Sequence, residues 1–206
     1  MSVNRVCHVS LFFLTILLLV PLGCRQPTEA EIASAKVQKV RDNPEMPDFE
    51  AIQLLAEAYF KTDAVRMDES NRVVIEARAA NLSSMVDIGQ DLGDAKQRAK
   101  RGTLFFFLQQ LRKFTQSISN RQFDAMDITI QTAVNQGDGV NWVPTYQFVL
   151  EKQKMADFEM LFDKMDTAFG QPNQDFDRIF DASFPRLEKI WDVKLDAFDE
   201  FVYQRN

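Results

Sequence analysis

Residues 104–118 read LFFFLQQLRKFTQSI, and this stretch decides the expected fold class. Five apolar residues in a row, 104–108, open it, and the apolar positions that follow keep spacings of three and four: Leu111, Phe114 and Ile118. This is the period of an α-helix. A turn that is apolar all the way round predicts a central helix that is buried on every side. A buried strand is the alternative for the five-residue run, but no turn residue interrupts the helical spacing after it. Gly102 and Thr103 are expected to break or cap a helix just before this one.

Helical spacing also describes the apolar residues on both sides of this stretch. The helix-starting residues Pro47 and Asp48 predict a helix whose apolar positions are Phe49, Ile52, Leu55 and Tyr59. A second periodic run has Ile75, Leu82, Met85, Val86 and Leu92. A third, downstream, has Phe123, Met126, Ile130 and Val134. Residues 136–144, which contain two glycines and a proline, predict a loop after it.

The most regular pattern is a seam of aromatic and methionine residues near the C-terminus: Phe148, Met155, Phe158, Phe162, Met165 and Phe169. Their spacing is that of a heptad repeat, which is typical of a helix packed along one face, and Gly170 and Pro172 are expected to end it. The seam fits either the core of the protein or a dimer contact. A last helical run, with Pro185 expected to kink or restart it near Ser183, has Phe176, Phe180, Phe184, Leu187, Trp191, Leu195, Phe198 and Val202.

The fold expected from these patterns is all-α, because no segment shows a competing strand pattern. Residues 48–206 are expected to form one domain, a bundle of about six helices. The chain contains 18 Phe but only 3 Tyr and 2 Trp, so the core of the bundle is expected to be rich in Phe. Residues 24–47 are polar and contain three prolines, which predicts a tether with one short exposed helix at 29–41.

The first 23 residues have the pattern of an export signal. A short polar start that contains Arg5 precedes an apolar run from Val9 to Val20. That run is shorter than the roughly 20 apolar residues that cross a bilayer as a helix. Cleavage of residues 1–23 is therefore expected, and the protein is expected to be exported.

Gly23 and Cys24, followed by a polar stretch, resemble the cleavage site of bacterial lipoproteins. The resemblance implies that Cys24 becomes the mature N-terminus, is acylated on sulfur and nitrogen, and anchors the protein to a membrane of the cell envelope. Inner and outer membrane are equally compatible with it. Pro21 and Leu22 stand where that family has Leu and a small residue. A periplasmic or secreted protein with an ordinary signal peptide, or an uncleaved hydrophobic anchor, remains the alternative.

Several kinds of chemistry are absent from the mature chain. The single histidine, His8, and one of the two cysteines, Cys7, lie in the signal, and Cys24 is the acylated residue. Without histidine, a Ser-His-Asp triad, His-ligated zinc and His-ligated haem are excluded. The chain also lacks the glycine-rich phosphate-binding motifs and CxxC. We therefore expect no catalytic residue, no metal and no cofactor.

Charge divides the chain into a basic and an acidic part. Residues 95–122 contain no acidic residue and seven basic ones: Lys96, Arg98, Lys100, Arg101, Arg112, Lys113 and Arg121. Residues 157–200 contain 12 Asp and Glu against five Lys and Arg. The basic segment is expected either to pack beside the acidic one or to form a surface for a partner protein, anionic lipid or cell-wall polymer. An exported protein of net charge −6 is not expected to bind nucleic acid.

These observations lead to one principal functional hypothesis and two alternatives. The principal one is a membrane-anchored, exported, non-enzymatic helical module that binds another envelope component. The first alternative is a protein that binds a small apolar ligand in a Phe-lined cavity between helices. The second, more remote, is a hydrolase that uses a pair of carboxylates.

Overall fold

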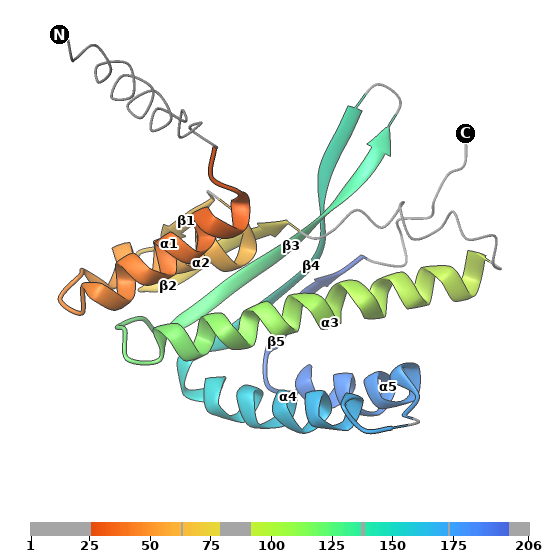
Figure 1. The fold of residues 1–206 in the computed structure, drawn as a ribbon. Coiled ribbons are helices and arrows are strands. Elements are labelled where there is room, and N and C mark those ends of the chain that lie inside the picture. The colour runs from red at the N-terminus through yellow and green to blue at the C-terminus, as the bar shows by residue number, and fades with distance from the viewer. Residues whose placement is uncertain (1–25, 63, 79–91, 137–138, 173, 198–206) are drawn as a thin grey trace, which may run out of the picture.

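The protein has a mixed α/β fold, so the expected all-α bundle of about six helices is wrong. A computed structural model describes residues 26–62, 64–78, 92–136, 139–172 and 174–197, with side chains described in these ranges except at 92–99 and 133–141. Within these ranges, five helices pack with a five-stranded mixed sheet (Figure 1). No helix in this part of the chain is both long and apolar enough to cross a membrane.

The elements alternate along the chain. The helices are α1 (Glu29–Asp42), α2 (Asp48–Phe60), α3 (Leu92–Ile118), α4 (Met155–Phe169) and α5 (Phe176–Leu187), with one short 3₁₀ turn, η2 (Lys152–Lys154). The strands are β1 (Val65–Met67), β2 (Arg72–Arg78), β3 (Ala125–Gln136), β4 (Gly139–Glu151) and β5 (Asp192–Asp196). Strands β1 to β5 lie side by side in chain order.

Only one pair of neighbouring strands is parallel. β2 and β3 run in the same direction because the chain crosses over through α3 between them, whereas the other three pairs are antiparallel. β3 and β4 form a long hairpin with a register shift between Ile130 and Gln131. Beyond that shift the two strands pair only with each other, so they project from the sheet as a two-stranded arm, residues 132–136 and 139–143 (Figure 1).

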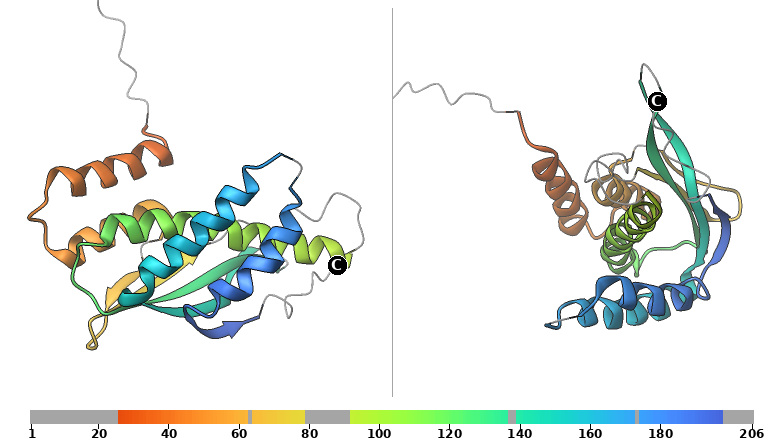
Figure 2. Two further views of the ribbon diagram at one scale, coloured as in Figure 1. Left: turned by 90° about the horizontal axis from the view of Figure 1, so that it is seen from below. Right: turned by 90° about the vertical axis from the view of Figure 1, so that its right-hand side faces the viewer.

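All the helices lie on one face of the sheet. The end-on view in Figure 2 shows α2 and α3 against this face, α1 outside α2, and α4 and α5 below α3. Side chains of β3 alternate accordingly: Met126, Ile128 and Ile130 are buried under the helices, while Asp127 and Thr129 on the other face are half-buried. The sheet therefore has a covered face, which forms the core, and an open face.

The stretch 104–118 is the central helix that its sequence predicts. It forms the second half of α3, and its inward positions are fully buried: Leu104, Leu108, Leu111, Phe114 and Ile118. Two details were predicted wrongly. α3 runs without a break through Gly102 and Thr103, and Phe106 is 61% exposed, so the apolar turn is not wrapped on every side.

The Phe and Met seam is mostly helix, and it is core. Met155, Phe158, Phe162 and Met165 are buried on one face of α4, so the seam is filled within a single chain. Aromatic rings continue the core into α5, where Phe180 and Phe184 stack at 4.9 Å between ring centroids. α5 also continues through Pro185 to its end at Leu187. The first seam residue, Phe148, lies in β4 instead, with its ring 4.7 Å from that of Trp191.

Some segments with helical spacing of apolar residues form strands instead. Ile75, Met126, Ile130 and Val134 lie in strands, and the loop expected at 136–144 is largely the start of β4. Helical spacing in the segment from Phe123 to Val134 coexists with a strict alternation of apolar residues at 126, 128 and 130. Leu195 lies in β5, whereas Leu82, Met85, Val86, Phe198 and Val202 lie outside the described residues.

Helix α1 packs on the domain, in the segment where the sequence predicts an exposed helix within a tether. Thr28 caps it: the Thr28 hydroxyl accepts from the Glu31 amide, and the Glu31 carboxylate accepts from the Thr28 amide at 2.6 Å. Val40 is buried near the other end, and Lys36 bonds to Glu57 on α2 at 2.8 Å. Helix α1 thus begins directly after its cap at Thr28.

Candidate functional site

The predicted basic residues do not form one continuous surface. Lys96 and Arg98 lie in α3, but their side chains are outside the described part of the chain. Lys100 and Arg101 form ion pairs with acidic residues of the C-terminal part, at 3.0 Å to Asp196 and 2.7 Å to Asp181. The basic segment therefore packs beside the acidic segment at these positions.

Two more residues of this set are also committed to contacts within the protein. Arg112 pairs with Asp163 on α4. Arg121 is buried, and its Nη1 donates to the Met46 carbonyl at 2.8 Å, which ties the end of α3 to the connection between α1 and α2. The hydrogen bonds that Arg101 donates to Asp181 are the largest cause that raises the pKa of Arg101 further above its already high value. Lys113 is exposed and has no ion pair among the described residues.

Two hollows are open to ligands at opposite ends of the sheet. The first, which we call the far hollow, has a volume of about 830 Å³ and lies where β3 begins and β4 ends. Its lining combines four cations with three carboxylates: Arg72, Lys152, Lys154, Lys194, Asp124, Glu151 and Asp192. Both signs of charge are therefore presented within one depression.

Neighbouring charges in the far hollow are partly paired. Glu151 accepts from Gln153 at 2.8 Å and lies 3.4 Å from Lys154, and these contacts lower the pKa of its carboxyl. Lys194 pairs with Asp192 in the same way along β5. The Nε of Arg72 is buried without a hydrogen-bond partner among the described residues. Arg72 lines the hollow, and a guanidinium can donate hydrogen bonds to the oxygens of a carboxylate.

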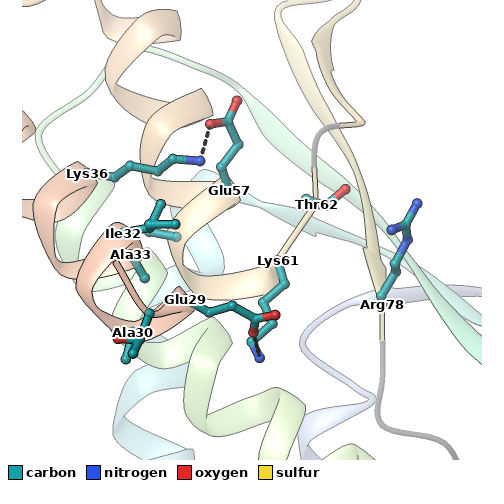
Figure 3. Close-up of a pocket in the computed structure, with 11 residues that line it drawn as sticks. Glu29, Ala30, Ile32, Ala33, Lys36, Glu57, Lys61, Thr62 and Arg78 are labelled. Atoms are coloured by element: carbon teal, nitrogen blue, oxygen red, sulfur yellow. Dashed lines mark hydrogen bonds and ion pairs between the residues drawn. The ribbon is translucent and has the colours of Figure 1, made fainter. Parts of the chain in front are cut away.

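The second hollow, which we call the α1–α2 groove, has a volume of about 640 Å³ (Figure 3). It lies between the first turns of α1, the last turn of α2 and the end of β2. Lys36 and Glu57 join its two helices, and Lys61 bonds to Glu29 at 2.8 Å, which lowers the pKa of the Glu29 carboxyl. Small and apolar residues line the rest: Ala30, Ile32, Ala33 and Ala58.

Arg78 connects this groove to the projecting arm. It lines the groove from the end of β2, across from Lys36 and Glu57 in Figure 3. Its guanidinium carbon lies 5.4 Å from the centre of the Trp142 ring on β4. Arg78 has no ion pair within the described residues, and Trp142 is 38% exposed. An arginine and an indole thus lie together beside a groove that has both charged and apolar side chains.

Sequence reasoning missed both hollows. Their residues come from segments far apart in the chain, such as 28–36 with 57–62 and 78, and no local motif links them. The signal that was available was the alternation of charged and apolar residues in 72–78, RVVIEAR, which marks a strand with one open face. No group of three or more His, Cys, Asp or Glu in the described part of the chain is arranged to hold a metal ion.

Comparisons with known proteins find no matching family model, no matching curated protein and no matching solved structure. Cys24, the residue of the resemblance to bacterial lipoproteins, lies outside the described residues.

Proposed function

We propose that the protein is an exported, lipid-anchored, non-enzymatic module of the bacterial envelope that binds cell-wall polymer in the far hollow. The anchor is the lipid on Cys24, and the bound component is a polymer whose peptide parts carry both free carboxylates and free amines. The predicted helical module is replaced here by an α/β module whose sheet has one open face.

The position of the far hollow carries this proposal. Arg72 in the far hollow and Arg78 at the α1–α2 groove stand at opposite ends of β2, about 20 Å apart at roughly 3.3 Å per residue. The groove includes Thr28, only four residues after Cys24, so it is the end nearest the anchor. With a lipid on Cys24, we therefore expect the far hollow to be on the side of the domain directed away from the membrane.

Charge complementarity selects the ligand class. Lysines and Arg72 attract carboxylates of the polymer, and the carboxylates of Asp124 and Glu151 attract its amines. A purely anionic or purely cationic ligand would meet like charges in the same hollow. The alternative of an apolar ligand between helices has less support, because the described core rings pack against one another, as Phe60 and Phe114 do at 5.1 Å.

Co-sedimentation with insoluble cell-wall sacculi tests the binding. We expect the acylated protein, kept in mild detergent, to pellet with sacculi. The double variant Lys154→Ala, Lys194→Ala should bind at least about fivefold more weakly, because it removes two exposed cations of the hollow. Lys189→Ala, an exposed lysine after α5, is the matched control and should bind like the unmodified protein. A protein that stays in the supernatant with sacculi contradicts the proposed function.

The anchor has an independent test. The intact mass of the protein extracted from membranes should equal residues 24–206 plus a diacylglyceryl group and one further acyl chain. The Cys24→Ser variant should lack both additions, and it should not be found as cleaved, lipid-anchored protein in the membrane fraction. An unmodified mass for the natural sequence contradicts the lipid anchor.

A further inference from the structure

The linker between the expected lipid on Cys24 and the start of α1 at Thr28 is short. The capping box at Thr28 fixes the start of α1, and α1 packs along α2, so only residues 25–27 lie between Cys24 and the cap of this helix in the sequence. Four residues from Cys24 to Thr28 span at most about 14 Å when fully extended. The rim of the α1–α2 groove, which includes Thr28 and Glu29, is therefore held close to the headgroup layer of whichever membrane carries the lipid.

The groove and the arm point to the same side of the molecule. Thr28, Glu29 and Arg78 line the groove together, and the centre of the Trp142 ring on the arm lies 5.4 Å from the guanidinium carbon of Arg78. Trp142 belongs to this arm, and Arg78 lies beneath its ring. A membrane that meets the start of α1 therefore also meets Trp142.

The residues at this end have the chemistry of a membrane interface. Tryptophan favours the boundary between headgroups and acyl chains, because its ring is apolar and its N–H bonds to water or phosphate. Ile32 is 44% exposed on the rim of the groove. Lys36 and Lys61 are already paired with glutamates, which leaves Arg78 as the cation with no ion pair in the described part of the groove.

We propose that the α1–α2 groove and the Arg78–Trp142 pair rest on the surface of the anchoring membrane, with Arg78 bound to an anionic phospholipid headgroup and Trp142 inserted beside it. This inference rests on the proposed lipid anchor. It gives the domain a second membrane contact, which sets its orientation and directs the far hollow toward the cell wall. A contact of this kind also prevents the domain from rotating freely about its short linker.

Quenching of tryptophan fluorescence by brominated lipid tests the contact. The acylated protein is reconstituted into vesicles of brominated phosphatidylcholine, with or without phosphatidylglycerol. Trp191 is buried between Phe148 and Phe158 and serves as an internal reference that lipid does not reach. We expect a quenched component in the anionic vesicles that is lost in the Trp142→Phe variant.

Reversing the charge of Arg78 distinguishes binding of an anionic headgroup from mere closeness of Trp142 to the membrane. Arg78→Glu should reduce the quenched component at least about twofold in anionic vesicles, because the anionic headgroups attract the guanidinium and repel a carboxylate. Lys113→Glu makes the same change at an exposed position of α3 that does not line the groove, and it should leave quenching unchanged. Equal quenching in Arg78→Glu, or equal quenching without phosphatidylglycerol, overturns the headgroup assignment.

Flotation of the same vesicles distinguishes the two proposals. If the protein floats with the vesicles but Trp142 is not quenched, the lipid anchor stands and the surface contact is overturned, which would leave this groove to a protein partner. If the acylated preparation does not float, the anchor itself is contradicted and the inference is overturned with it.

Discussion

The two faces of the sheet are formed by the same strands but differ in the burial of their side chains and in the pairing of their polar groups. On the covered face, Ile128 is fully buried beneath the helices, whereas its neighbour Thr129 on the open face is half-buried. Polar groups follow the same division. Arg121 and Tyr146 on the covered side are buried and hydrogen-bonded, while the far hollow on the open side presents partly paired charges. The difference indicates that stability resides on one face and leaves the other free to bind.

Adjacent positions of β3 provide the strongest test of this contrast. Ile128→Ala should lower the free energy of unfolding by about 2–5 kcal/mol, because it leaves a cavity in the core beside the central strand. Thr129→Ala, one residue along on the open face, should cost less than about 1 kcal/mol. Urea unfolding of both variants measures the difference, and equal costs would contradict the division between the faces.

Arg121 tests whether the basic segment stabilises the fold. Arg121→Ala should cost about 2–4 kcal/mol, because it leaves the Met46 and Pro44 carbonyls without the buried donor that they share and removes the cation beside Asp48. Lys113→Ala, at an exposed position of the same segment, should leave the urea midpoint unchanged. If the two variants unfold at the same urea concentration, Arg121 is not the structural link between α3 and the α1–α2 connection.

Tyr146 makes the stability of the covered face depend on alkaline pH. Burial, and then the charge of Glu188, raise the pKa of the Tyr146 hydroxyl well above its usual value. A raised native pKa favours the protonated fold, so this contribution is complete below about pH 10, where an unfolded tyrosine titrates, and declines above it. Tyr146→Phe should cost about 1 kcal/mol at pH 8 through its lost hydrogen bonds.

Comparing the natural sequence with Tyr146→Phe at two pH values isolates the loss of stability that comes from Tyr146. Unfolding midpoints at pH 8 and pH 11 should fall further for the natural sequence than for Tyr146→Phe, since the lysines titrate alike in both. A variant that loses as much stability as the natural sequence between these pH values would show that Tyr146 is not the group responsible.

The smallest effect is expected at the ion pairs between α3 and α5. Arg101 lies 2.7 Å from Asp181 and 3.4 Å from Asp177, but both carboxylates are substantially exposed. Arg101→Ala should therefore cost no more than about 1 kcal/mol, and the loss should shrink as salt is added. Thermal unfolding in low and high salt measures it, and a salt-independent loss would mean that Arg101 acts through packing instead.

How far the sequence predicted the fold depends on how local each signal was. The helices at Asp48–Phe60, Met155–Phe169 and Phe176–Leu187 were predicted, because their apolar faces repeat over three or more turns with acidic residues in the first turn. β3 was missed because Phe123, Met126 and Ile130 fit a helix as well as 126, 128 and 130 fit a strand. Only the partners of β3, which begin at Arg72 and end at Glu151, distinguish the two periods.

The candidate sites divide in the same way. Cys24 was identified from neighbouring residues and stays a prediction, since it lies outside the described residues. The basic segment was visible as composition, but its pairing at Arg101 and Arg112 depends on where the acidic helices pack. The burial of Arg121 depends on the connection between α1 and α2. The Arg78–Trp142 contact joins residues 64 positions apart and had no sequence signal.

The sequence by itself determined the features that depend on near neighbours, which are the amphipathic helices of the C-terminal part. The export signal with its cysteine, and a mature chain without histidine, rest on the same kind of local pattern and stay predictions. Tertiary structure alone decided that 72–78, 125–136 and 139–151 are strands, that one face of their sheet is covered, and that two hollows lie at its ends. The physical reason is that a helix satisfies its backbone hydrogen bonds within one segment, whereas a strand satisfies them only through partners elsewhere in the chain.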